Sequence, residues 1–330
     1  MSVSATEIQD QKFNTLGLSK MIVNETLVCT YSRDLGQVSD NHPVLVLIHG
    51  YPQSAYMWRH LIPLFPPNAP LFVPDLPGYG ASAPIKENDK LTVGTTILSA
   101  LQTVVKRSSS STFPSPIPVI LIGHDRGARV AHRLAVSGAE GIRILGLCLI
   151  DIVPTQTQWA ASSNAREAMG YFHWPFLANV EVAQKMISAY GGDRWCEEMI
   201  LLWAGKNPNG LANLKSDNSL KIYSEFFKNP QTIEASSLDY LAGATTDVDA
   251  QKEDQAQGRR IPCPVLLIYS KHYIGSRFDV RKEWEEWVKT GVSIQDHALG
   301  NDIGHFGAEE APEESARVVW GWLRGLGVNF

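Results

Sequence analysis

The chain has 330 residues, of which 44% are hydrophobic and 19% are charged, and its formal net charge is −5. This length and composition predict a globular protein with a sizeable core, long enough for one large α/β domain with an inserted module. The acidic balance argues against partners such as nucleic acid or an anionic membrane surface.

The beginning of the chain, MSVSATEIQDQKF, contains acidic residues and no apolar run, so we expect no signal peptide there. No apolar stretch is long enough to predict a membrane span. The four cysteines are scattered, without the spacing of a metal site or of a disulfide framework. We therefore expect a reduced, cytoplasmic protein that needs no metal and no cofactor, and the sequence is compatible with a homodimer.

Aliphatic runs indicate the sheet. Short edge strands are expected between residues 21 and 31, and buried strands at 44–48, 71–75, 119–122, 144–150 and 265–270. Continuous runs of this kind are typical of parallel strands covered on both faces. A serine- and proline-rich surface loop is expected at 107–118, a helix at 280–289, and a last helix after Ala311 with Pro312 in its first turn. The alternation predicts an α/β fold with a mostly parallel sheet flanked by helices.

The strand pattern stops in one long segment. From residue 154 to residue 258 it gives way to polar and aromatic helical stretches rich in Trp and Tyr. We interpret 154–258 as a helical cap, or lid, inserted into a core domain made of 1–153 and 259–330. A cap there would cover the carboxyl edge of the sheet, where open α/β folds bind ligands. The alternative is a separate domain without a catalytic role.

A tight turn after the third buried strand is the main candidate for the reactive group. Gly123-His124-Asp125-Arg126-Gly127 stands between that strand and a helical pattern with alanines at 128, 131 and 135. Strand, glycine-flanked turn and thin helix match a nucleophile elbow, with Asp125 where esterases have Ser. A carboxylate is already ionised at pH 7 and can displace a leaving group from a saturated carbon, forming an ester. The alternative is that Asp125 only caps the next helix.

Hydrolysis of such an ester requires a histidine base. His305 lies in a glycine-containing loop after the last predicted strand. His297 and His272 are alternatives whose sequence surroundings match such a loop less well. Asp151 ends the fourth buried run, which would bring its carboxylate to the same sheet edge to orient the base. Asp279 is the rival orienter, and we favour Asp151. The order of nucleophile, acid and histidine then agrees with the elbow motif.

Two backbone groups are candidates for an oxyanion hole. His49-Gly50-Tyr51-Pro52 follows the first buried run directly. The N–H of Tyr51, together with that of Arg126, would stabilise the negative oxygen formed when water attacks the ester. The alternative for the first segment is a plain turn.

Two arginines occupy an unfavourable place. Arg126 and Arg129 fall in the first turn of the predicted helix, three residues apart, where cations oppose the helix dipole. Paired guanidinium groups suit a carboxylate. They would also offset the repulsion between an ionised Asp125 and an anionic acid, about 4 kcal/mol at 4 Å and an effective dielectric constant near 20. The alternative is an ion pair with acids of the cap or surface.

With these motifs in view, the chain resembles the fluoroacetate and haloacetate dehalogenases, a branch of the α/β-hydrolases close to the epoxide hydrolases. The segments that carry the resemblance occur in the family's order, from residue 44 to the His305 loop: HGYPQSAYMW, DLPGYGAS, GHDRGARVAHRLA, LIDIVPT, YFHWPF, DYLAGATTD and GHF. Departures occur at the serine-rich insertion, at Tyr51 where Phe is common, and in the cap at 206–219. They leave pocket size and substrate length open.

The resemblance implies an α/β-hydrolase fold with a small haloacid as substrate. It implies that Asp125 is the nucleophile, His305 the base and Asp151 its orienter, and that Arg126 and Arg129 bind the substrate carboxylate.

By the same resemblance, His173, Trp174 and Tyr240 of the cap would hold the departing halide. Imidazole N–H, indole N–H and phenol O–H are three donors that can stabilise fluoride as its charge develops. The alternative is that these aromatic side chains only pack within the cap.

Three functions are therefore compatible with the sequence. We favour hydrolytic dehalogenation of short 2-haloacids. An epoxide hydrolase would use the same aspartate with two cap tyrosines, for which Tyr171, Tyr190, Tyr223 and Tyr240 are candidates. The third is a non-hydrolytic biosynthetic enzyme or a cap-gated small-molecule binder on the same scaffold.

Overall fold

The computed structural model describes residues 3–108 and 114–330, and eight strands form one sheet in the order β1-β2-β4-β3-β5-β6-β7-β8. β2 pairs antiparallel with both β1 and β4 at one edge, and every pairing from β4 to β8 is parallel. The strands are β1 (Ser19–Ile22), β2 (Cys29–Arg33), β3 (Val44–Ile48), β4 (Leu71–Pro74), β5 (Ile117–His124), β6 (Ile142–Ile150), β7 (Val265–Ser270) and β8 (Ile294–Leu299). All five aliphatic runs are strands, as predicted.

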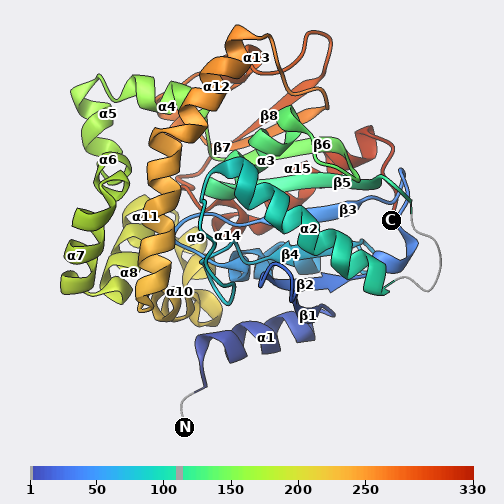
Figure 1. Ribbon diagram of the computed structural model, residues 1–330, viewed down its shortest axis with the longest axis horizontal. Coiled ribbons are helices and arrows are strands. Elements are labelled where there is room, and N and C mark those ends of the chain that lie inside the picture. Colours follow the sequence, from blue (N-terminus) through green and yellow to red (C-terminus); the bar gives the residue numbers. More distant parts are fainter. Residues whose placement is uncertain (1–2, 109–113) are drawn as a thin grey trace.

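Helices cover both faces of this sheet. Figure 1 shows α2 and α3 in front of the strands and α15 behind them. The helices of this part are α1 (Ala5–Thr15), α2 (Lys90–Ser108), α3 (Arg126–Ser137), α13 (Val280–Glu285), α14 (Gly307–Glu310) and α15 (Pro312–Gly325). Short 3-10 helices occupy Leu35–Gln37, Ala55–His60, Ile62–Leu64 and Ile274–Ser276. α15 begins at Pro312, as the sequence predicts.

A helical segment lies between β6 and β7. It begins at Thr155 and ends at Ala256, within the range expected for the cap. Its helices are α4 (Thr155–Ala161), α5 (Ala165–Gly170), α6 (His173–Ala178), α7 (Val180–Tyr190), α8 (Gly192–Trp203), α9 (Pro208–Lys215), α10 (Ser219–Phe227), α11 (Pro230–Ala244) and α12 (Thr246–Ala256), with a 3-10 turn at Ser216–Asn218. Figure 1 shows these helices stacked beside one end of the strands.

Two predicted boundaries are wrong. α13 ends at Glu285 rather than at 289, because the chain leaves the helix to form a bridge between Val288 and Ile261. The backbone N–H of Ile261 donates to Trp287, and the N–H of Lys289 donates back to Ile261. The loop expected at 107–118 is shorter at both ends, because α2 continues to residue 108 and β5 begins at residue 117. Its part from 109 to 113 lies outside the described residues.

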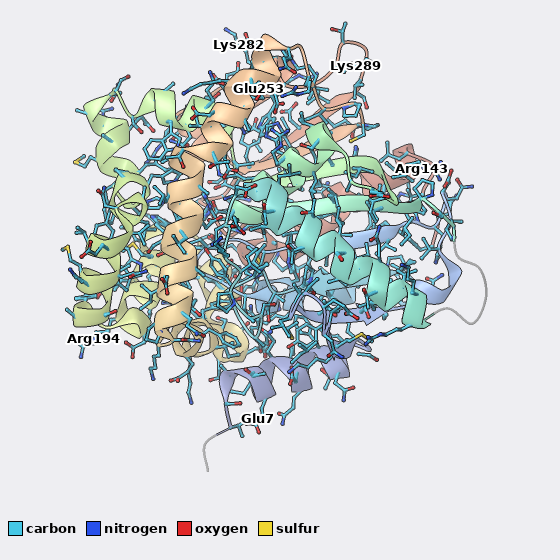
Figure 2. The ribbon with its side chains drawn as sticks, viewed as in Figure 1. Glu7, Arg143, Arg194, Glu253, Lys282 and Lys289 are labelled. Atoms are coloured by element: carbon cyan, nitrogen blue, oxygen red, sulfur yellow. The ribbon has the colours of Figure 1, made fainter. Side chains whose placement is uncertain are left out.

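Most charged side chains lie at the surface. Figure 2 labels exposed examples around the rim of the molecule, namely Glu7, Arg143, Arg194, Glu253, Lys282 and Lys289. Burying a charge is costly unless it is paired, so the buried charges described below require partners or a function. Among the described residues, no helix is both long and apolar enough to cross a membrane.

Candidate active site

The register of the parallel strands brings three turns of the chain together at the carboxyl ends of the strands. Ile48 pairs with Gly123, and His124 pairs with Ile150, so β3, β5 and β6 end level with one another. The residues that follow these strands, Tyr51, Asp125 and Asp151, therefore meet there. Ligands of open α/β sheets bind at this carboxyl edge.

Asp125 occupies a strained turn between β5 and α3. Its backbone has φ 47° and ψ −115°, in a region that side chains other than glycine rarely adopt. Neighbouring glycines make the turn sterically accessible, because a Cβ atom on Gly127 would lie 2.2 Å from the carbonyl oxygen of Ile48. The Asp125 side chain makes no capping hydrogen bond to α3, so helix capping does not explain this aspartate.

One oxygen of the Asp125 carboxylate accepts a hydrogen bond, and the other has no hydrogen-bond donor among the described residues. The backbone N–H of Tyr51 donates to its Oδ2 at 3.0 Å. Burial alone raises the pKa of Asp125, but the positive charges of His305, Arg126 and Arg129 outweigh burial and lower this pKa to about 2. Asp125 is therefore ionised at neutral pH although it is only 7% exposed.

His305 lies beside this carboxylate and is oriented by Asp151. Its Nδ1 is 2.5 Å from Oδ2 of Asp151, whose other oxygen accepts the N–H of Ser270 at 2.8 Å. Burial lowers the pKa of His305, but the hydrogen bond and charge of Asp151 outweigh it, and the pKa is raised. The rival orienter Asp279 instead caps α13 through the N–H of Lys282.

The two alternative bases lie elsewhere. His297 is on β8 and bonds Glu314 at 2.7 Å, and His272 is exposed with its Nε2 3.7 Å from Asp302. Neither lines the cavity described next.

A small enclosed cavity adjoins Asp125. It offers ≈ 20 Å³ to the centre of a water-sized sphere, which is room for about one or two water molecules. Its wall consists of Asp125, Arg129, Asp151, Tyr171, His173, Trp174, Trp203, Tyr240, Tyr273, Ile274 and His305. The cavity thus brings together Asp125, Asp151 and His305, with Arg129 and a lining of aromatic side chains.

Arg126 and Arg129 have different environments, although both lie in the first turn of α3. Arg126 is ion-paired with Asp239 through Nε, and its Nη2 donates to the Asp239 carbonyl at 2.7 Å. Arg126 does not line the cavity, and its Nη1 is the guanidinium nitrogen that has no partner in the described part of the chain. This is the ion pair with a cap acid that the sequence allowed as an alternative.

Arg129 lines the cavity as a buried cation. Its Nη1 donates to the Val153 carbonyl and the Thr155 hydroxyl, each at 3.0 Å, and no described residue bonds its Nε. Among the described residues, no carboxylate lies within ion-pairing distance of Arg129. Burial and the nearby charge of Arg126 lower its pKa to about 10, so it remains charged at pH 7.

The three predicted halide donors all reach the cavity. His173 and Trp174 come from the start of α6, and Tyr240 comes from α11. Burial lowers the pKa of His173 to about 3, so its ring is neutral and carries one N–H. The guanidinium carbon of Arg126 lies 4.2 Å from the centre of the Tyr240 ring.

The candidate tyrosines for an epoxide fall into two groups. Tyr171 and Tyr240 line the cavity. Tyr190 is exposed and bonds Glu198, and Tyr223 is buried against Glu309, to which it donates at 2.8 Å. Only the first pair is placed to act on a bound molecule.

Sequence reasoning missed several residues of this region. Trp203 and Tyr273 line the cavity, and no local pattern distinguishes them from other aromatic residues of the chain. Asp239 stands next to Tyr240, yet its pairing with Arg126 and with Lys90 of α2 depends on contacts between distant segments. These ion pairs join the cap helix α11 to the core.

Glu310 is a further residue without a sequence signal. One of its carboxylate oxygens accepts the N–H groups of Gly205 and Gly304 at 2.8 and 2.9 Å, and the other accepts that of Phe306 at 3.0 Å. Gly205 belongs to the cap and the other two flank His305. Glu310 therefore links the loop that carries His305 to the loop that follows α8.

Comparisons with known proteins agree with this arrangement. The chain matches the model of the alpha/beta hydrolase family over residues 45–318. It is 27% identical over 294 residues to a fluoroacetate dehalogenase of Burkholderia sp, which covers 87% of this chain and 90% of that protein. It is 26% identical over 273 residues to a soluble epoxide hydrolase of Corynebacterium sp. strain C12, covering 82% of this chain and 86% of that protein.

A solved structure agrees as well. A protein from Nostoc sp PCC 7120 is 29% identical, with a TM-score of 0.76 over 94% of this chain and 99% of that one. The family match extends over most of the chain, from β3 into α15, and includes the strand edge that carries Asp125, Asp151 and His305. The chain belongs to the alpha/beta hydrolase family.

Proposed function

We propose that this hydrolase removes the halogen from short 2-haloacids through an ester formed on Asp125. The observation that supports this most is Arg129, a buried cation at the wall of the cavity that has no carboxylate partner within residues 3–108 and 114–330. Burying an unpaired charge is costly, so such a site gains stability when an anion binds. A carboxylate as ligand satisfies this arginine through charge-assisted hydrogen bonds.

In the first step, the free Oδ1 of Asp125 attacks the carbon that bears the halogen. The new C–O bond forms as the carbon–halogen bond breaks, and the halide leaves with the bonding electrons. Arg129 holds the substrate carboxylate, and Arg126 contributes at most its Nη1, since Asp239 occupies its other donors. His173, Trp174 and Tyr240 donate to the departing halide.

In the second step, His305 removes a proton from water, which attacks the carbonyl carbon of the Asp125 ester. The carbonyl oxygen is Oδ2, so the negative charge develops on the atom that already accepts the N–H of Tyr51. Arg126 begins α3, and its N–H has no partner within the helix, which makes it the second donor. The ester bond then breaks, and the hydroxy acid takes the proton from His305.

An epoxide hydrolase is the second candidate, because Tyr171 and Tyr240 come from different parts of the helical segment and line the same cavity as Asp125. Two such hydroxyls can protonate an epoxide oxygen. A neutral epoxide leaves Arg129 without an anion, and for this reason we rank dehalogenation first.

A substrate panel separates the two functions. We expect halide release from fluoroacetate and chloroacetate, measured with a halide electrode, and no diol from styrene oxide or cyclohexene oxide. Diol formation without halide release would support the second candidate instead. Binding of haloacetates without either reaction would support a binding protein.

Arg129 provides a sharper test of substrate charge. We expect Arg129→Gln to lower kcat/KM for chloroacetate roughly 10- to 100-fold, because the charged hydrogen bonds to the acid are lost. The neutral analogue chloroacetamide should lose far less, so the preference of the enzyme for the acid should shrink. Steady-state kinetics with both compounds measure this change.

Arg133→Gln is the matched control. Arg133 lies one turn further along α3, is paired with Asp254 and does not line the cavity. Its replacement should leave the ratio between the two substrates unchanged. Equal losses for chloroacetate and chloroacetamide in Arg129→Gln would contradict a carboxylate site at this arginine.

A further inference from the structure

A surface groove shares two residues with the active-site cavity. The groove offers ≈ 240 Å³ and is lined by Leu202, Trp203, Ala204, Gly205, Lys206, His272, Tyr273, Asp302, Ile303 and Gly304. Trp203 and Tyr273 line the cavity as well. Two larger surface hollows, one around α8 and α10 and one around α15, share no lining residue with the cavity.

The cavity itself is too small to admit an acid without a change in its wall. Its ≈ 20 Å³ holds about one or two waters, so substrate and products pass only if a side chain moves. The wall towards the groove is formed by Trp203, the last residue of α8 in the cap, and Tyr273, in the turn after β7.

These two side chains are held by packing rather than by hydrogen bonds. The indole N–H of Trp203 is buried without a partner, and among the described residues no group bonds the Tyr273 hydroxyl. The backbone near Trp203 is held by two hydrogen bonds. The backbone N–H of His305 donates to the Trp203 carbonyl at 3.0 Å, and the backbone N–H of Lys206 donates to the Asp302 carbonyl at 2.9 Å. Among the described residues, a rotation of these two side chains would therefore break no side-chain hydrogen bond, although Trp203 would lose its packing against His173.

The groove is lined by an exposed lysine. Lys206 makes no ion pair within the described parts of the chain, and Asp302, the acid that also lines the groove, lies 3.7 Å from Nε2 of His272. On a protein with a net charge of −5, a lysine at this place attracts a small anion towards the opening.

We propose that this groove is the access route for the acid, with Trp203 and Tyr273 as the gate and Lys206 as the charge that guides anions to it. The substrate class in this statement rests on the proposed function. The route itself rests on the shared walls of groove and cavity.

Site-directed labelling tests the route. All four native cysteines are buried, so a new surface cysteine is the only one that a bulky maleimide should reach readily. Leu202 is 60% exposed and lines the groove, whereas Leu201, its neighbour on the same helix, is 38% exposed and does not. Leu202→Cys is therefore the test variant, and Leu201→Cys is the matched control.

We expect a fluorescein maleimide on Leu202→Cys to lower kcat/KM for chloroacetate roughly tenfold or more, because association is obstructed. The same label on Leu201→Cys should change it less than about twofold, and both unlabelled variants should resemble the wild type. Wild-type kcat/KM in fully labelled Leu202→Cys, with labelling verified by mass spectrometry, would overturn the proposal.

A second readout separates the route from the proposed function. Acetate carries no leaving group, and its association can be followed by tryptophan fluorescence, because Trp174 and Trp203 line the cavity. If acetate associates more slowly with labelled Leu202→Cys but not with labelled Leu201→Cys, the result supports the route even if no haloacid is turned over. Equal association rates in both labelled variants reject it, whatever the reaction is.

The role of Lys206 has its own variant. Lys206→Gln should lower kcat/KM several-fold at low ionic strength, and the difference should disappear near ~0.5 M salt, where charges are screened within a few ångströms. Lys221→Gln, an exposed lysine of α10 away from the groove, is the control. An effect of Lys206→Gln that does not depend on salt would exclude guidance by charge.

Discussion

Asp125→Asn should release no measurable halide from fluoroacetate or chloroacetate, a loss of at least about 10³-fold, because an amide oxygen cannot form the ester. The variant should fold, since Asn has the same shape and tolerates the positive φ of this turn better than most residues. Halide release and a thermal melt, measured on the same preparation, check both statements.

A single turnover in heavy-oxygen water tests the same step in the unaltered enzyme. Water attacks the ester carbon, so one labelled oxygen should remain in the carboxylate of Asp125, where peptide mass spectrometry detects it. Product formed without any label in Asp125 would mean that water attacks the substrate directly. In that case Asp125 would be a base and not the nucleophile.

His305→Gln should stop the reaction after the first step. We expect one equivalent of halide per active site, followed by a fall in turnover of about 10²- to 10⁴-fold, because water is no longer activated. Asp125 should then carry a stable carboxymethyl ester that intact-protein mass spectrometry detects. His297→Gln, which changes a histidine paired with Glu314 outside the cavity, should turn over normally.

The same assignment sets the pH dependence. His305 must be neutral to accept a proton, and Asp151 raises its pKa. Hydrolysis of the ester should therefore slow as the pH falls through the raised pKa of His305. The first step should persist further into acid, because the pKa of Asp125 is about 2. Accumulation of the ester at acid pH in the wild type would agree with this order, whereas normal turnover by His305→Gln would contradict it.

The sequence by itself determined the sheet and the chain turns that carry the chemistry. Continuous runs of aliphatic residues are typical of parallel strands covered on both faces, and each predicted run is a strand. Because parallel strands end at one edge, the residues that follow β3, β5 and β6 meet there. This local information brings Asp125 and Asp151 together, whereas the position of His305 beside Asp151 also depends on the loop that follows β8.

The tertiary structure decided what the local pattern leaves open. Arg126 and Arg129 are equivalent in a helical pattern, yet Asp239, 113 residues further along the chain, pairs with Arg126, and no carboxylate among the described residues pairs with Arg129. Asp279 follows a strand as Asp151 does, but a helix cap occupies it. The size of the cavity and the two aromatic side chains that close it depend on how cap and core pack. Such contacts join distant segments, so no periodicity or spacing along the chain encodes them.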